Sequence, residues 1–332
     1  MGGKAGDLEA KVQRIVEGAP CRMGVSIRIV GQGPILELNA REKFPLASVY
    51  KVPILATLFH KVSLGELSLD QRLVLREEDK TLSSDLGFLR PGLNPTLHDL
   101  CYLMIAHSDN TATDMVHRLI GLDAPNAYMK SLGLDSIDIY FPCREYFLMT
   151  LGYGGYGDIS PKELVSRWRN LTRVEQAREI DTIYRQNRTV TADIMRRKGQ
   201  DLLGLSEEKE DEDSRRMDEA FDNHGSPSDI AQLLELIATD RIVPGQLTKQ
   251  MLEYMFNCDS RSRLPASIPP EVLVANKTGT VSGVVNDSAI IFASPGRIIT
   301  CACLTSEVHY EDKSKVERAI SDIGLQAFRA RL

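Results

Sequence analysis

The chain has 332 residues, and its 40 Lys and Arg against 46 Asp and Glu give a formal net charge of -6. This length allows about two domains or one large one, and the acidic balance gives no overall attraction to polyanions such as nucleic acids. No uncharged apolar run reaches the roughly 18 residues that a membrane-spanning helix needs. We therefore expect neither a nucleic acid nor a membrane as a partner.

The first residues are polar and pass directly into a helical pattern. This start leaves no room for the apolar segment of a signal peptide, so the sequence predicts a cytoplasmic protein unless a leader has been trimmed. The six cysteines are scattered without a CxxC pair, and the six histidines form no HExxH motif. These patterns fit neither a zinc site nor a disulfide-rich secreted domain. We expect a reducing compartment and no metal or cofactor.

The N-terminal segment predicts a helix followed by a β-hairpin. Four apolar residues are spaced as one face of a helix: Leu8, Val12, Ile15 and Val16. Two β-prone stretches follow at residues 23–30 and 35–38, and the turn-forming segment 31–34 separates them.

The middle of the chain, from residue 48 to about 149, has a helical pattern. One predicted helix face carries Ile54, Leu55, Leu58 and Phe59.

Residues 150–225 differ in composition from their surroundings. They begin with a Gly-rich segment, continue with basic helical stretches and include an acidic run at 207–213. Such a run is usually a solvated face or a mobile linker, and a partner site is the alternative.

β-prone stretches return at residues 272–275, 288–293 and 298–304, and an amphipathic helix ends the chain. Strands near both termini around a helical middle predict that the two ends of the chain meet in one sheet. We expect a mixed α/β (α+β) fold, with an antiparallel sheet flanked by helices (residues 1–45 and 226–332) and an all-helical domain (residues 46–225).

Three short motifs carry the strongest chemical signal. Ser48-Val49-Tyr50-Lys51 begins an apolar helical run, Ser108-Asp109-Asn110 follows a helix, and Lys277-Thr278-Gly279 ends a β-prone run. Each motif alone is a weak signal, and their occurrence together in this order is the informative observation.

The first motif suits a serine nucleophile with a lysine base. A serine hydroxyl attacks poorly until a base takes its proton, and residues three apart on a helix share a face, so we expect Lys51 to reach Ser48 Oγ. Burial and a second ammonium at Lys277 would both lower the pKa of Lys51 and allow it to accept a proton. Free backbone N–H groups at the helix start would stabilise an oxyanion beside Ser48.

The other two motifs suit proton transfer and substrate binding. Ser108 can pass a proton to a leaving group, and Asn110 can hold a substrate amide. Lys277 and Thr278 can bind a carboxylate, and Gly279 allows the strand backbone to approach the substrate closely.

This set of motifs resembles that of the serine β-lactamases and penicillin-binding proteins, and within them class A. The 60-residue separation of Ser48 and Ser108 looks like the class A spacing, and residues 44–53 look like that family's nucleophile segment. The likeness covers about residues 7–149 and 226–332 and implies a β-lactamase/transpeptidase-like fold.

The resemblance also implies roles for individual residues. Ser48 would be the acylated nucleophile, Lys51 and Ser108 the proton relay, and the backbone N–H groups of Ser48 and Thr280 the oxyanion hole. Arg263 looks like an arginine that supports binding of the substrate carboxylate in some members, with an ordinary surface arginine as the alternative.

Class A enzymes carry a Glu-x-x-Leu-Asn pattern whose Glu activates the water that releases the acyl group. Here Glu145 and Leu148 match, but Met149 replaces the Asn. We expect Glu145 to act on that water, with a structural salt bridge as the alternative. Because Met149 stands in place of the Asn that helps to hold this water, we expect deacylation to be slow or differently organised.

The 169 residues between Ser108 and Lys277 exceed the usual spacing in the family, and most of the excess falls in residues 150–225. We expect a helical insertion beside the active-site mouth that acts as a lid, with the glycines at 152, 154, 155 and 157 as hinges. A passive surface insertion is the alternative.

The sequence therefore favours a serine hydrolase that opens a β-lactam amide through an acyl-enzyme. Two alternatives stay open: a non-β-lactam amidase, peptidase, esterase or acyl transferase with the same machinery, or a sensor that β-lactams acylate without turnover. Each hypothesis implies a small-molecule amide or ester as the reaction partner. The motif set and Glu145 favour the first, whereas Met149 and the insertion favour the alternatives.

Overall fold

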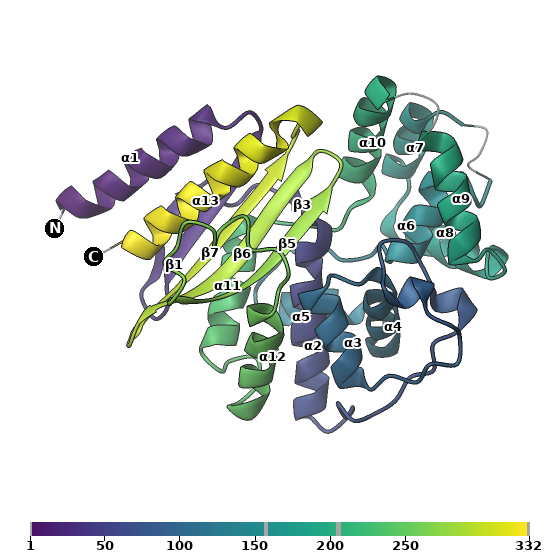
Figure 1. Ribbon diagram of the computed structural model, residues 1–332, viewed down its shortest axis with the longest axis horizontal. Coiled ribbons are helices and arrows are strands. Elements are labelled where there is room, and N and C mark those ends of the chain that lie inside the picture. Colours follow the sequence, from purple (N-terminus) through teal and green to yellow (C-terminus); the bar gives the residue numbers. More distant parts are fainter. Residues whose placement is uncertain (1, 156–158, 204–206, 331–332) are drawn as a thin grey trace.

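The computed structural model describes residues 2–155, 159–203 and 207–330, and its centre is an antiparallel sheet (Figure 1). Five strands form this sheet in the order β2-β1-β7-β6-β5, and two short strands, β3 and β4, pair separately. The strands are β1 (Arg22–Ile29), β2 (Gly33–Leu38), β3 (Phe44–Pro45), β4 (His224–Gly225), β5 (Leu273–Val281), β6 (Val284–Ser294) and β7 (Arg297–Ser306).

The two ends of the chain meet in this sheet, which confirms the expected arrangement. Strand β1 pairs with β7, and Val25 lies opposite Cys303. The motif Lys277-Thr278-Gly279 lies inside β5, which runs beyond the β-prone stretch at 272–275. Lys277 and Thr278 are buried in this strand. A β-prone pattern consists mainly of apolar and branched residues, so it does not reveal that the strand continues through the motif.

Most of the helices lie between strands β3 and β5 in the chain. Within the described residues they are α1 (Gly2–Gly18), α2 (Lys51–Ser63), α3 (Leu97–Ala106), α4 (Asn110–Ile120), α5 (Ala124–Ser131), α6 (Cys143–Thr150), α7 (Pro161–Arg169), α8 (Arg173–Gln186), α9 (Ala192–Leu203), α10 (Glu207–Phe221), α11 (Pro227–Ala238), α12 (Gln246–Phe256) and α13 (Lys313–Arg329). Short 3₁₀ turns connect some of them, and one of these, η1 (Ala47–Tyr50), leads into α2.

The sheet is covered on both faces (Figure 1). Helices α1 and α13 pack on one face, where Ile291 joins their apolar cluster, and α11 and α12 pack on the other, where Ile290 belongs to a second cluster. That second cluster continues into the helical middle, α2 to α5. Helix α2 is buried over residues 51–59, on all sides rather than on the one face that the apolar spacing predicts.

Helices α7 to α10 form the region expected as an insertion. They share an apolar cluster with α6 that includes Leu148, Trp168, Ile183 and Phe221. The acidic run lies within helix α10 and not in a linker. The expected hinge glycines at 152, 154 and 155 have positive φ angles of 78°, 77° and 85°, and Gly157 lies outside the described residues.

The structure bears on two further expectations. None of the described helices combines the length and the apolar content that a bilayer crossing requires. All six cysteines are free thiols, and five of them are buried.

Candidate active site

Ser48 lies in the turn η1, directly before helix α2. The preceding Ala47 has a φ of +44°, a left-handed conformation that costs a non-glycine residue about 1–3 kcal/mol unless its surroundings hold it. The turn is held from both sides, since Asn286 Nδ2 donates to Leu46 O at 3.1 Å and Leu46 N donates to Asn223 O at 2.7 Å.

Lys51 lies one helical turn after Ser48 and is completely buried. Its Nζ donates to Ser108 O at 2.6 Å, to Asn110 Oδ1 at 2.8 Å and to Ser108 Oγ at 3.2 Å. Burial lowers the pKa of Lys51, although the nearby Cys143 and Asp109 oppose the shift. The first two motifs therefore meet at this ammonium, and the neutral form that a base needs is favoured by burial.

Lys277 reaches the same serine from strand β5. Its Nζ donates to Ser108 Oγ at 3.0 Å and to Thr278 O at 2.8 Å. Burial lowers the pKa of Lys277 to about 7, and repulsion from Lys51 adds to this shift. All three motifs therefore converge on Ser108 Oγ, which lies between two lysines.

Asp109 fixes the middle motif in place. Its Oδ1 accepts hydrogen bonds from Ala112 N at 2.7 Å and from Ser84 Oγ at 2.8 Å, and its Oδ2 accepts from Leu86 N at 2.9 Å. This caps helix α4 and ties it to the loop before it, so Ser108 and Asn110 are held on a rigid support.

Gly279 brings β5 against the turn that carries Ser48. A Cβ atom at this position would lie 2.6 Å from Leu46 O and 3.0 Å from Ser48 N, so only glycine allows the two backbones to come this close. The approach places the neighbouring Thr280 on the same side of the site as Ser48, and both residues line one cleft.

This cleft has a volume of about 640 Å³. It contains five of the predicted site residues, Ser48, Ser108, Asn110, Thr278 and Thr280, and Lys51 and Lys277 reach it through Ser108. The other residues that line it are Ala47, Tyr50, Ser83, His107, Phe141, Cys143, Tyr146, Phe147, Asp218, Phe221, Asp222, Asn223, Val281 and Ser282.

Glu145 is not among the described residues that line the cleft. Its carboxylate pairs with the Arg118 guanidinium, which is the salt bridge that the sequence left as an alternative. Met149, at the position of the expected Asn, is buried in the apolar cluster that α6 shares with α7 to α10. The structure therefore does not bring the expected water-activating pair to Ser48.

Arg263 also lies outside the cleft lining. Only 3% of it is exposed, so it is not a surface arginine. Its guanidinium donates to Asn286 O at 2.6 Å, to Gly279 O at 2.9 Å and to Thr280 Oγ1 at 2.6 Å, and it pairs with Glu317 at 3.2 Å. In this geometry Arg263 supports strand β5 rather than facing a substrate carboxylate.

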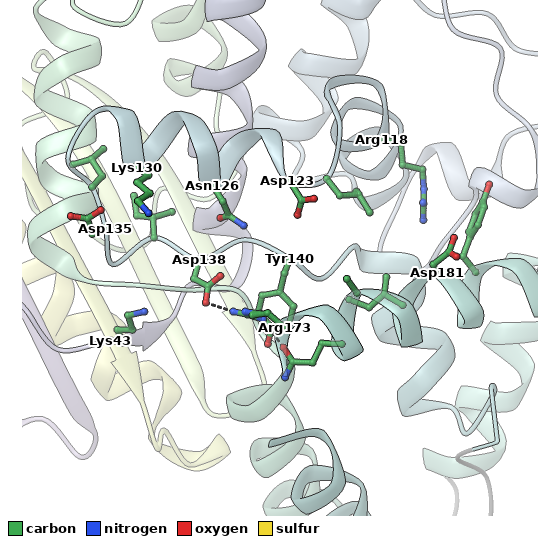
Figure 2. Close-up of a pocket in the computed structure, with 17 residues that line it drawn as sticks. Lys43, Arg118, Asp123, Asn126, Lys130, Asp135, Asp138, Tyr140, Arg173 and Asp181 are labelled. Atoms are coloured by element: carbon green, nitrogen blue, oxygen red, sulfur yellow. Dashed lines mark hydrogen bonds and ion pairs between the residues drawn. The ribbon is translucent and has the colours of Figure 1, made fainter. Parts of the chain in front are cut away.

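A second cavity of about 630 Å³ lies between α4, α5, the segment 134–140 and α8 (Figure 2). Arg173 pairs with Asp138 there, and its guanidinium lies 3.6 Å from the centre of the Tyr140 ring. Arg118, the partner of Glu145, also lines this cavity. None of the residues of the three motifs lines it, so the cleft with Ser48 is the candidate active site.

The sequence did not indicate four other groups in the cleft. Tyr50 Oη lies 2.9 Å from Cys143 Sγ, and the carboxylates of Asp218 and Asp222 line the cleft at the end of the insertion. No sequence motif connects Asp222 with Ser48, because its contact with the nucleophile turn spans 175 positions of the chain.

Over 2–155, 159–203 and 207–330, no three His, Cys, Asp or Glu side chains gather as a metal site.

The chain is similar in sequence and fold to known proteins. Residues 7–330 match the family described as the Beta-lactamase enzyme family. A β-lactamase of Rhodobacter capsulatus is 32% identical over 127 residues, which span 38% of this chain and only 43% of that relative. The VEB-1 β-lactamase of Pseudomonas aeruginosa is 23% identical over 327 residues, covering 96% of this chain and 88% of the relative.

Solved structures share the fold over the whole chain. The crystal structure of a class A β-lactamase from Bacteroides cellulosilyticus has a TM-score of 0.69 at 17% identity and covers 98% of each chain. At this identity the likeness bears on the fold alone.

Proposed function

Because the chain belongs to the beta-lactamase enzyme family, we propose that it opens a β-lactam amide through an acyl-enzyme on Ser48. The observation that carries this proposal is the convergence of Lys51 and Lys277 on Ser108 Oγ, in the cleft that Ser48 lines.

Acylation begins when Lys51 takes the proton of Ser48 Oγ. Burial favours the neutral amine of Lys51, and a neutral lysine one helical turn from the serine is suited to this task. Ser48 Oγ then attacks the amide carbonyl of the substrate. The oxyanion that forms is bound by the backbone N–H groups of Ser48 and Thr280, which β5 brings together.

Ser108 delivers the proton that the leaving nitrogen needs. Its Oγ accepts from the ammonium groups of both Lys51 and Lys277, at 3.2 and 3.0 Å. Its hydroxyl proton is therefore free to point toward the substrate, since a hydroxyl has one donor and two acceptor positions. Lys51 passes its proton through Ser108 Oγ to the leaving nitrogen, and the amide bond breaks.

Substrate binding falls to the remaining motif residues. Lys277 and Thr278 bind a carboxylate on the substrate. Asn110 accepts from Lys51 through Oδ1 and donates to Leu82 O through Nδ2 at 3.1 Å. Its second amide hydrogen is left for the substrate amide.

The insertion serves as a lid over this cleft. Phe221 and Asp218 of α10 are part of the cleft wall, and Asp218 Oδ2 accepts from Ser282 N at 2.7 Å, next to strand β5. Asp218→Ala removes that contact and should change kcat/KM more for bulky substrates than for small ones. An equal effect on both would reject the lid.

A chromogenic cephalosporin tests the proposed function directly. Continuous hydrolysis is expected, with absorbance rising far beyond one equivalent of enzyme. A single stoichiometric reaction that leaves a stable adduct would indicate an acylated sensor instead. No reaction with the cephalosporin but turnover of an activated ester would remove the β-lactam from the proposal.

A further inference from the structure

Hydrolysis of an acyl-enzyme needs a base that activates water beside Ser48, and Glu145 does not line the cleft. Among the described residues that do, the carboxylates are Asp218 and Asp222. They come from the last turn of α10 and the residue that follows it, at the C-terminal end of the insertion. These two aspartates are therefore the carboxylate candidates for that base.

Asp222 is in direct contact with the nucleophile turn. Its Oδ2 accepts a hydrogen bond from Ala47 N at 2.6 Å, and Ala47 is the residue before Ser48. Its Oδ1 accepts from Asn223 N at 2.7 Å. Since each carboxylate oxygen can accept more than one hydrogen bond, both oxygens keep a position for water.

Pairing of short strands fixes this contact. Strand β4 follows Asp222 and pairs with β3, which precedes the nucleophile turn, and Phe44 lies opposite Gly225. Leu46 N also donates to Asn223 O at 2.7 Å. Backbone contacts of the residues that follow Asp222 thus hold it against the turn that carries Ser48.

Asp218 contacts residues outside the nucleophile turn. Its Oδ1 accepts from Tyr146 Oη and its Oδ2 accepts from Ser282 N. Burial and the charge of Asp222 raise the pKa of Asp218 well above its ordinary value. When two close carboxyl groups differ in this way, one holds the proton while the other ionises, so Asp222 is the one available as a base.

The environment of Asp222 suits such a base. Burial raises the pKa of Asp222 to about 7, although the hydrogen bonds from Ala47 N and Asn223 N favour the carboxylate and oppose this rise. A general base works best when its pKa lies near the working pH.

We propose that Asp222 is the catalytic base of deacylation, the role that the family resemblance gives to Glu145. In this step, which rests on the proposed acyl-enzyme, Asp222 takes one proton from water as the water oxygen bonds to the acyl carbon. The bond between that carbon and Ser48 Oγ then breaks, and the proton on Asp222 returns to Oγ through the cleft. The products are the free acid and the unmodified serine, so water is the only co-reactant.

Asp222→Asn separates this role from a structural one. The amide oxygen of Asn can still accept from Ala47 N, and only the bond from Asn223 N is lost, but Asn cannot take a proton from water. We expect the acylation rate to stay within about threefold and deacylation to fall by about 10²–10⁴. The adduct on Ser48 should then accumulate in the intact mass spectrum, with a burst of one equivalent of product.

Two further variants and a control complete the experiment. Asp222→Ala should lose acylation as well, because Ala47 then lacks its acceptor. Glu145→Gln should turn over without accumulating adduct. Asp135→Asn, an exposed residue at the second cavity, controls for the substitution itself and should behave as the wild type.

The experiment can reject Asp222 as the base independently of whether a β-lactam is the substrate. Normal deacylation in Asp222→Asn, or accumulation of adduct in Glu145→Gln alone, would reject Asp222 as the base. Each variant is also tested with p-nitrophenyl acetate, so that an enzyme inert to cephalosporin still reports on Asp222 through the acetyl-enzyme. If neither reagent acylates the wild type, both proposals are rejected.

Discussion

The carboxylate of Glu145 forms an ion pair with the guanidinium of Arg118, and Glu145 is not among the described residues that line the nucleophile cleft. Its other oxygen, Oε2, is buried without a hydrogen-bond partner among the described residues. Burial raises the pKa of Glu145 to about 7, although Arg118 opposes that shift. The pair therefore joins α4 to α6 as a structural contact.

Glu145→Gln tests this assignment. We expect kcat within about twofold of the wild type, because the side chain does not reach the cleft. Loss of the charge partner of Arg118 should lower the free energy of unfolding by roughly 1–3 kcal/mol, measured in urea. A hundredfold fall in kcat with unchanged stability would restore Glu145 to the catalytic step.

The orientation of helix α6 explains why Glu145 is not part of the cleft lining. Cys143, Tyr146 and Phe147 line the cleft, and their spacing of i, i+3 and i+4 defines one helix face. Glu145, two residues after Cys143, lies on the opposite side. The sequence shows that such a face exists, but it cannot show which side of the helix meets Ser48, because packing of the insertion decides it.

Arg263→Lys distinguishes support of β5 from substrate binding. A lysine cannot match the forked contacts of the guanidinium with Gly279 O and Asn286 O. We expect a loss of roughly 1–3 kcal/mol in unfolding free energy and a fall in kcat. Unchanged stability with a raised KM alone, measured on a substrate that carries a carboxylate, would indicate a direct contact with that carboxylate.

Gly279→Ala tests the close approach of β5 to the nucleophile turn. The new Cβ would lie 2.6 Å from Leu46 O, so one backbone must move. Because a displacement of about 1 Å at a reacting centre can cost about 10²-fold, we expect kcat/KM to fall by about that factor. Gly18→Ala, where no atom lies within 4 Å, is the matched control. Wild-type kinetics in Gly279→Ala would contradict the proposed oxyanion hole.

Lys277 should make substrate binding depend on pH. Its pKa is lowered to about 7, so the ammonium is present below that pH and is lost as the pH rises through it. The KM of a substrate with a carboxylate should therefore rise above pH 7, by at most about tenfold per pH unit. An ester without a carboxylate is the control, and a flat KM profile for both would exclude Lys277 as the anion-binding group.

Much of the fold follows from patterns in the sequence. The hairpin of β1 and β2 and the pairing of β1 with β7 agree with the β-prone stretches at the two ends of the chain. The motif residues also come together, since each sits at a helix start or on a strand whose apolar neighbours fix its place. Their chemical roles stay predictions.

The contacts of Asp222 could not be predicted in the same way. The hydrogen bond to Ala47 N joins residues 175 positions apart, and it depends on a two-residue strand pairing, β3 with β4. Strands this short carry no periodicity that a sequence pattern could reveal.

The most direct test of the account is the intact mass of the enzyme, quenched with acid during reaction with a cephalosporin, for the wild type and Ser48→Ala. We expect a transient acyl adduct on the wild type, located on the peptide that contains Ser48, and neither adduct nor hydrolysis in the variant. Hydrolysis by Ser48→Ala at the wild-type rate, or an adduct on another residue, would contradict it.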